Sequence, residues 1–320
     1  MRPLKVGFVL PTWCSPPDQL RWNDVLDLAR EAESAGFDSL WATDHLLLES
    51  TNAELRKRAG GEVPPGAEVL PEGYMEVFSV LAALAAAVPG MELGTLVACT
   101  GYRNPGLLAK IADAIDEISG GRFVLGLGAG DSEAEHHVFG FAYEQPVSRF
   151  EEALTIIRRL LREGRLDYQG SFYSVRELEL LPRGPRATGP PILIGTLNPK
   201  PRMQRLVAQY ADIWNGWLAY GVSWPEAVAG QRDIVDGACR AHGRDPASLE
   251  HTAGLRVLMP GSLYSPPAHE RPLKGSPQQI AEALRGFAAA GLAQVQVALS
   301  PGTRGSVREF GKALALLEAP

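Results

Sequence analysis

The chain has 320 residues, 45% of them hydrophobic, which is enough to bury one large core or two smaller ones. The formal net charge is −6 and the basic residues are spread along the sequence, so the composition does not indicate a nucleic-acid-binding protein. No apolar run reaches the ~18 residues that a membrane-spanning helix requires, so we expect no membrane partner.

Short apolar strands alternate with amphipathic helices along the chain. The sequence predicts strands at 4–10, 37–43, 91–99, 122–128, 190–195, 212–217, 251–259 and 293–299. The predicted helices lie at 20–35, 75–88, 106–119, 153–164, 201–211, within 224–241, at 278–291 and at 306–319. Three residue pairs have the spacing of helix starts: Asn104 with Pro105, Ser148 with Glu151, and Ser276 with Gln279.

This alternation predicts an α/β protein, a closed (β/α)8 TIM barrel with loop insertions. Apolar strands joined by helices form a parallel sheet that is covered on its outer face. Eight such repeats in ~250 residues plus insertions are typical of the barrel. The extra length falls in four segments, at 46–74, 132–147, 164–190 and 259–275. No linker composition divides the chain, so we expect one domain over residues 1–320.

The stretch "GRFVLGLGAGD", residues 121–131, has two interpretations. A dinucleotide-binding fingerprint follows the first strand of a βαβ unit and has the spacing G-x-G-x-x-G. Here the glycines follow the fourth predicted strand with the spacing G-x-G-x-G, which favours the barrel. Gly126, Gly128 and Gly130 lack side chains, so a flat ligand or a neighbouring backbone can approach the strand closely. Asp131 then lies just past the carboxyl end of the strand, where barrel enzymes keep their chemistry.

Other predicted strands also end in polar or small residues. Asp44 and His45 follow the second strand, Gly195 and Thr196 the fifth, and Asn215 lies in the sixth. Because the carboxyl ends of barrel strands share one rim, we expect these residues to converge on one mouth.

Each candidate also has a structural interpretation that the sequence leaves open. His45 can satisfy a backbone carbonyl, and Asp131 can cap a helix around 132–138. Gly195 and Thr196 can form a plain turn. The functional interpretation depends on all of these residues falling on the same edge of the sheet.

The cysteines and histidines indicate a reducing environment and no metal. Cys14, Cys99 and Cys239 are far apart and form no CxxC motif, which is typical of buried thiols in a reducing compartment. The first residues, "MRPLKVGFVLPTW", have no small-residue cleavage site and read as the first strand, so we expect a cytoplasmic protein. No histidines have HxxxH or HExxH spacing, and the adjacent His136 and His137 face different ways, so we expect no metal site.

The sequence resembles the bacterial luciferase-like superfamily of flavin and deazaflavin oxidoreductases. The resemblance is carried by "VGFVLPTW", "LAREAESAGFDSLWATDHLL", "LGTLVACTGYRNPGLLAKIADAIDEISGGRFVLGLGAGDSEAEHHVFG", "RFEEALTIIRRLL", "YQGSFYSV" and "PPILIGTLNPKPRMQRLVAQYADIWNGW". It covers residues 4 to 217 well and the remainder loosely, and it implies a TIM barrel that is usually a homodimer. Some members use FMN with molecular oxygen, and others move a hydride with the 5-deazaflavin coenzyme F-420. The spacing around "TGYRNP" and "GLGAGDSEAEHHVFG" is more similar to the deazaflavin group.

The resemblance also implies roles for individual residues. Leu96 and Val97 align with the family's non-prolyl cis peptide, which backs the central cofactor ring. Asp44 and His45 match the pair that borders the reactive ring, where a histidine can carry a proton near neutral pH. Gly195 and Thr196 match the loop that approaches the cofactor phosphate.

The remaining cofactor-binding predictions are Gly128 and Asn215, at the ends of the fourth and sixth strands, and the catalytic predictions are His45 and Asp131.

Two departures from the family pattern affect the substrate. Deazaflavin sugar-phosphate dehydrogenases carry Glu where Asp131 stands, and a tryptophan shortly after the Asp-His pair. Here leucines follow that pair, which indicates a less polar substrate.

Together these features predict hydride transfer between coenzyme F-420 and an unidentified small organic substrate, with specificity set chiefly by segments 46–74 and 259–275. One alternative is an FMN-dependent monooxygenase that receives reduced FMN from a partner reductase and activates oxygen. A second alternative is a non-catalytic flavin-binding relative.

Overall fold

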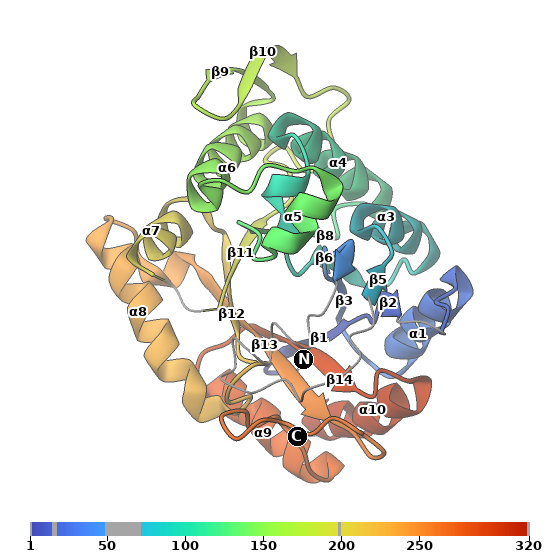
Figure 1. Cartoon of the computed structure of the whole chain (residues 1–320). Coiled ribbons are helices and arrows are strands. Elements are labelled where there is room, and N and C mark those ends of the chain that lie inside the picture. The colour runs from blue at the N-terminus through green and yellow to red at the C-terminus, as the bar shows by residue number, and fades with distance from the viewer. Residues whose placement is uncertain (1, 15–17, 49–71, 198–199, 319–320) are drawn as a thin grey trace, which may run out of the picture.

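The computed structural model describes residues 2–14, 18–48, 72–197 and 200–318, in which parallel strands close into a barrel. The strands of this sheet are β1 (Lys5–Val9), β3 (Ser39–Ala42), β6 (Glu92–Thr95), β7 (Ala98–Cys99), β8 (Phe123–Gly128), β11 (Ile192–Thr196), β12 (Ile213–Trp217), β13 (Glu250–Leu258) and β14 (Gln294–Ser300). Strand β11 pairs with both β12 and β8, which closes the ring, and β6 with β7 forms a single stave. The predicted TIM barrel is confirmed (Figure 1).

Helices surround the barrel in the order that the sequence predicts (Figure 1). They are α1 (Trp22–Ser34), α3 (Val77–Ala87), α4 (Pro105–Ser119), α6 (Pro146–Glu163), α7 (Pro201–Tyr210), α8 (Val228–Ala241), α9 (Pro277–Ala289) and α10 (Arg304–Glu318). Their apolar faces bury large side chains such as Phe150, Phe287 and Phe310 against the outer face of the strands. Each such side chain stabilises the fold by roughly 1.5–3 kcal/mol relative to exposure. Within the described residues, no helix combines the length and the apolar character needed to cross a membrane.

Two of the three predicted helix starts are confirmed. The Asn104 side chain accepts hydrogen bonds from the N–H groups of Gly106 and Leu107, and Ser276 forms a reciprocal capping box with Gln279. The predicted capping box at Ser148 is wrong. With Ser148 as N-cap the helix would begin after that residue, whereas α6 begins at Pro146 and already contains Ser148. A proline at the first helical position already has the required backbone angle, so it started the helix earlier.

The barrel interior contains an apolar layer and a polar layer. The apolar layer consists of Val9, Trp41, Leu96, Val124, Leu193 and Ile213. In the polar layer, Asn215 donates to Thr252 and Gln296, and Gln294 donates to Ser39. Buried amides and hydroxyls that satisfy one another in this way fill the lumen, so the barrel is a packed core with its opening at one rim.

The glycines of β8 make room for a bulge in the neighbouring stave. Between β6 and β7 the peptide bond Leu96–Val97 is cis, which confirms the prediction for this position. A Cβ added to Gly126 would lie 1.9 Å from the Thr95 carbonyl oxygen, and one added to Gly128 would lie 2.7 Å from Val97. The glycines therefore admit a neighbouring backbone, one of the two options that the sequence allowed, and the dinucleotide interpretation is wrong because β8 is an internal barrel stave.

Several further short elements lie outside the eight predicted strands and eight predicted helices or at their ends. Strands β2 (Trp13–Cys14), β4 (Leu47–Leu48) and β5 (Glu72–Tyr74) form a small antiparallel sheet, and β9 (Arg165–Gln169) with β10 (Ser174–Glu179) forms a hairpin at the periphery (Figure 1). Helix α5 (Glu133–Phe139) follows β8, and 3-10 turns occupy Thr100–Tyr102, Pro225–Ala227 and Pro246–Ser248. Most of the predicted specificity segment 46–74 lies outside the described residues.

Candidate active site

A histidine–carboxylate pair lies at the carboxyl end of β3. His45 Nδ1 lies 2.9 Å from Glu135 Oε2, and Glu135 Oε1 accepts the backbone N–H groups of Leu46 and Leu47. The His45 side chain is 30% exposed, whereas the Glu135 side chain is 0% exposed. Because the carboxylate accepts the hydrogen on Nδ1, it fixes the ring orientation and leaves Nε2 for a bound molecule. Within the described parts of the chain, Nε2 has no hydrogen-bond partner.

Helix α5 is the element that carries Glu135 to this position. Its N-cap is Ser132, whose side chain accepts a hydrogen bond from the backbone N–H of Glu135. Tyr102 donates its hydroxyl hydrogen to Glu135 Oε2 over 3.0 Å. The carboxylate thus accepts hydrogen bonds from two side chains and two backbone groups, which holds it ionised although it is buried.

The pair shifts the pKa values of both partners. Burial acts to lower the pKa of His45, but the hydrogen bond and charge of Glu135 act in the opposite direction and leave it raised. Burial acts to raise the pKa of Glu135, and the contacts with His45, Leu46 and Tyr102 leave it lowered. Near neutral pH, the site therefore favours an imidazolium beside a carboxylate, and an imidazolium can donate a proton.

Asp44 points away from this pair into a separate cluster. Its oxygens accept a two-point contact from Arg103, at 2.6 and 3.0 Å, and a hydrogen bond from the N–H of Cys99. Arg103 also contacts Glu76. Asp44 is 0% exposed, so of the predicted Asp-His pair only His45 reaches the mouth.

Asp131 lies exposed just past β8, as the sequence predicts for its position. The alternative that it caps the following helix is wrong, because Ser132 is the N-cap. The negative charge of Asp131 acts on His45 and on Tyr220, so it belongs electrostatically to the same mouth.

The bottom of the mouth is formed by the Val97 side chain, which the bulge between β6 and β7 places at the rim; we call this surface the Val97 ledge. Val97 is half-buried, while the residues on either side of it are buried. A Cβ on Gly195 would lie 2.9 Å from the Val97 side chain, and one on Gly128 still closer, so both positions need glycine for the ledge to exist. A flat apolar surface bordered by backbone is suited to a planar heterocycle.

The other predicted cofactor-binding residues support the rim from below. The Thr196 hydroxyl accepts a hydrogen bond from Trp214 Nε1, and Asn215 belongs to the polar layer of the lumen. Thr12, 1% exposed after β1, has a hydroxyl with no partner among the described residues, the kind of group that a bound molecule satisfies.

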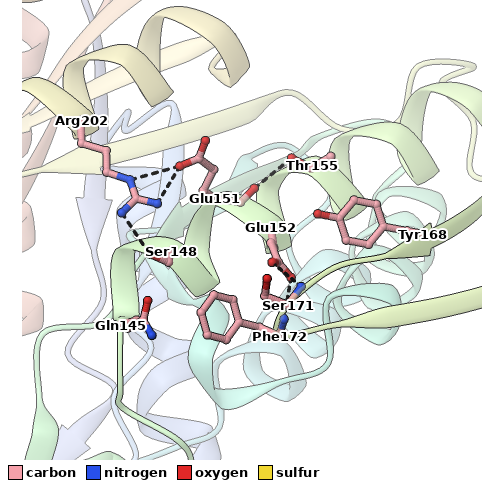
Figure 2. A pocket seen from close by; sticks show the side chains of 9 residues that line it. All are labelled: Gln145, Ser148, Glu151, Glu152, Thr155, Tyr168, Ser171, Phe172 and Arg202. Atoms are coloured by element: carbon pink, nitrogen blue, oxygen red, sulfur yellow. Dashed lines mark hydrogen bonds and ion pairs between the residues drawn. The ribbon is translucent and has the colours of Figure 1, made fainter.

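A pocket lies away from this mouth, between α6, α7 and the β9–β10 hairpin (Figure 2). It has a volume of about 680 Å³ and a polar lining. Its charged groups satisfy one another: Arg202 contacts Glu151 and Ser148, and Glu152 accepts the backbone N–H groups of residues 171–173. Because no charge in it lacks a partner, we assign the pocket a structural role.

Glu135 is the functional residue that sequence reasoning missed. The histidines of "EHHVFG" drew attention because of their chemistry, yet His136 is buried against Tyr102 and His137 is exposed. The useful signal was Ser132-x-x-Glu135, the spacing of a capping box directly after the β8 strand. Among the described residues, no three His, Cys, Asp or Glu side chains are grouped to hold a metal ion.

The fold and the site together place the protein in a structural class. It is a barrel protein whose titratable side chains meet at the carboxyl rim, as they do in barrel enzymes. Comparison with known proteins then gives the family. The family model of luciferase-like monooxygenases matches residues 5–260, and the chain belongs to this family.

Two curated relatives and one solved structure illustrate the range of the family. The chain is 32% identical to the phthiodiolone/phenolphthiodiolone dimycocerosates ketoreductase of Mycobacterium tuberculosis over 229 residues, 71% of the chain and 58% of the relative. It is 32% identical to the 5,10-methylenetetrahydromethanopterin reductase of Archaeoglobus fulgidus over 237 residues, 74% of the chain and 60% of the relative. The chain thus matches about three-fifths of the length of these relatives.

The fold is similar to that of an F-420-dependent secondary alcohol dehydrogenase solved with an F-420–acetone adduct. The TM-score is 0.77 at 16% identity, and the match covers 100% of both chains. At this identity the likeness shows the barrel fold.

Proposed function

We propose that this protein transfers a hydride between coenzyme F-420 and a small organic substrate, with His45 as the proton donor. The observation that carries the proposal is the 2.9 Å contact between His45 Nδ1 and the buried carboxylate of Glu135 at the barrel mouth. It is supported by the names of the relatives, a ketoreductase and a reductase, and by the F-420-dependent alcohol dehydrogenase with the same fold. The names of the two curated relatives describe reduction without oxygen insertion, which favours hydride transfer over the family's monooxygenase chemistry.

The residues of the mouth fit a flat cofactor. Leu96 and Val97 would lie beneath its ring, and Gly128 keeps the ledge clear of side chains. Gly195 and Thr196 would approach its phosphate through backbone N–H groups. Asp44 and Asn215 would hold these elements in place from below.

In this function the protein's own part is to orient the substrate, exclude water and supply a proton. When bound in its reduced form, the deazaflavin supplies the hydride. As the substrate's carbonyl oxygen gains electron density, the His45 Nε2–H bond breaks and an O–H bond forms. Glu135 stabilises the imidazolium before this transfer, and the neutral ring then regains a proton from water.

A titration with F-420 and with FMN, followed by oxygen-uptake measurement, tests the proposal. We expect F-420 to bind and turnover of a ketone or an alcohol to proceed without oxygen uptake. His45→Asn should lower kcat by about 10²- to 10⁴-fold, the usual contribution of a positioned acid. His137→Asn, on the exposed side of α5, should leave it unchanged.

Each alternative has its own outcome. Stoichiometric FMN binding with oxygen uptake would identify an FMN-dependent monooxygenase and overturn the cofactor assignment. Binding of neither cofactor would indicate a non-catalytic relative. We also propose a cytoplasmic homodimer, to which a separate reductase can supply reduced cofactor. Light scattering measures the mass of the particle in solution and hence the oligomeric state.

A further inference from the structure

Arg256 lies on the inner face of β13, near the mouth. Side chains alternate along a strand, so Thr252, Gly254 and Arg256 share one face. Thr252 hydrogen-bonds Asn215 in the lumen, and the Trp217 ring covers Gly254. Arg256 is the next residue of this row toward the carboxyl rim, and it is half-buried.

Two tyrosines hold the Arg256 guanidinium. Its carbon lies 4.3 Å from the ring centre of Tyr264 and 5.6 Å from that of Tyr220. Its Nε donates a long hydrogen bond of 3.4 Å to the carbonyl oxygen of Ala219. Rings that pack on a guanidinium fix its plane and leave the N–H groups at its edge for a planar acceptor.

Arg256 has no ion-pair partner within the described residues. It shares this with Arg149, which lies over Phe172 and donates to the Glu144 carbonyl away from the mouth, and it differs from two other arginines that lie over aromatic rings. Arg103 lies over Phe78 and is paired with Asp44, and Arg271 lies over Trp224 and is paired with Glu226. A half-buried cation without a carboxylate is costly unless it serves a ligand.

The carboxylates near the mouth are already engaged by tyrosines. Glu270 accepts the hydroxyl of Tyr264, and Glu72 accepts that of Tyr74. The charges of Arg256, Asp131, Glu270 and Glu72 all act on Tyr220, and Arg256 acts on it most strongly. A negative group entering the mouth is thus repelled by Asp131, Glu270 and Glu72 and attracted by Arg256 and by the His45 imidazolium. Of these two cations, the guanidinium has the planar set of N–H groups that matches an oxyanion.

The same mouth contains His45. Tyr74 packs on the His45 ring at 5.3 Å between centres, and the charge of Asp131 acts on both His45 and Tyr220. The two sides of the opening therefore share one electrostatic environment.

We propose that Arg256 binds an oxyanion group of the substrate, a carboxylate or a phosphate, so that anionic substrates are preferred over neutral analogues. This inference rests on the proposed function for the site but not on the identity of the cofactor. It modifies the sequence-based prediction of a less polar substrate, because one end of the molecule is now expected to be charged while the part near the leucines that follow His45 stays apolar.

Binding to the cofactor-free protein tests the inference. Benzoate, phenyl phosphate and the neutral benzamide would be titrated into the full chain while tryptophan fluorescence or heat is measured. We expect at least one of the two anions to bind more tightly than benzamide, and the better anion identifies the group. Arg256→Gln should weaken that anion by roughly 10- to 100-fold, the effect of losing charged hydrogen bonds.

Matched variants separate this effect from loss of folding. Arg271→Gln removes an arginine that lies over Trp224 in the segment after β13, and it should leave anion binding unchanged. Arg256→Lys keeps the charge and should retain part of the affinity. An equal loss of benzamide binding, an unchanged anion affinity in Arg256→Gln, or a selective loss of F-420 affinity in that variant would overturn the inference. Failure of F-420 to bind the wild type would overturn the cofactor assignment alone.

Discussion

Two charged clusters begin at consecutive residues, and they differ in whether one partner reaches the surface. In the first cluster, Asp44 is 0% and Arg103 11% exposed, and Cys99 supplies a further hydrogen bond. In the second, Glu135 is equally buried but His45 is 30% exposed. The first fixes the β3 loop to the region after β7. The second presents a charged ring at the barrel mouth, so the same kind of ion pair fixes two loops in one place and, in the function proposed above, supplies a proton in the other.

The largest expected effect comes from breaking the first cluster. Asp44→Asn leaves Arg103 buried with only Glu76 as a partner, and removing one member of a buried pair typically costs about 3–5 kcal/mol. We expect a loss near 3 kcal/mol in the free energy of unfolding, measured by urea denaturation, because Glu76 compensates part of the charge.

Glu76→Gln is the control from the same cluster. The Glu76 side chain is 42% exposed, so its pair with Arg103 is screened by solvent and should contribute at most about 1 kcal/mol. Glu76 is also the N-cap of α3, and glutamine keeps a side-chain oxygen that can accept the Ser79 N–H. Equal losses for the two variants would show that burial does not distinguish the clusters and would contradict the structural role of Asp44.

The second prediction concerns how the stability of the His45–Glu135 pair depends on pH. The folded-state pKa of His45 is raised, so its stabilising effect is fully present below the unfolded value of about 6.5 and is lost as pH rises through the folded value. The pKa of Glu135 is lowered, so its effect is present above about 4.3 and is lost as pH falls through the folded value. The pair therefore stabilises the folded state most between about pH 4.3 and 6.5.

Urea denaturation of wild type and Glu135→Gln at pH 5.5 and pH 8.5 measures this. We expect the substitution to cost more at pH 5.5, by about 1 kcal/mol, since one pKa unit corresponds to about 1.4 kcal/mol. His251, whose pKa is lowered by burial, gives a pH dependence of the opposite sign, but it is present in both proteins and cancels in the difference. If Glu135→Gln lowers the free energy of unfolding by the same amount at both pH values, Glu135 does not raise the pKa of His45.

The sequence predicts the repeating parts of this molecule better than its site. The barrel strands follow from apolar runs bounded by turns, and Asn104 and Ser276 start helices because their local chemistry suffices. His45 and Asp131 were placed at the rim because position within a barrel strand determines the rim. Glu135 could not be assigned in this way, because its partner lies 90 residues earlier and only the packing of α5 brings them together.

The same limit explains the two residues placed near the site whose side chains point elsewhere. Asp44 follows its strand as expected and Asn215 lies in the middle of β12, yet Arg103 and Gln296 engage them away from the mouth. The sequence around Arg256 does not indicate a binding residue. Only the folded chain brings Tyr220 and Tyr264 onto its guanidinium.

The smallest expected effect comes from removing the Tyr102 hydrogen bond to Glu135 while the negative charge of Glu135 is kept. Tyr102→Phe removes one hydroxyl donor from Glu135 Oε2 and keeps the ring packing on His136 and Phe141, so we expect a loss near 1 kcal/mol in stability. Because Oε2 then has one donor fewer, it attracts the His45 proton more strongly, and the pKa of His45 should rise, whereas Glu135→Gln should lower it. NMR titration of the His45 ring measures both shifts. Tyr210→Phe, which removes a hydroxyl bonded to Thr155 far from the mouth, should leave the titration unchanged. Shifts of the same sign in Tyr102→Phe and Glu135→Gln would show that the tyrosine acts on His45 by another route than through the carboxylate.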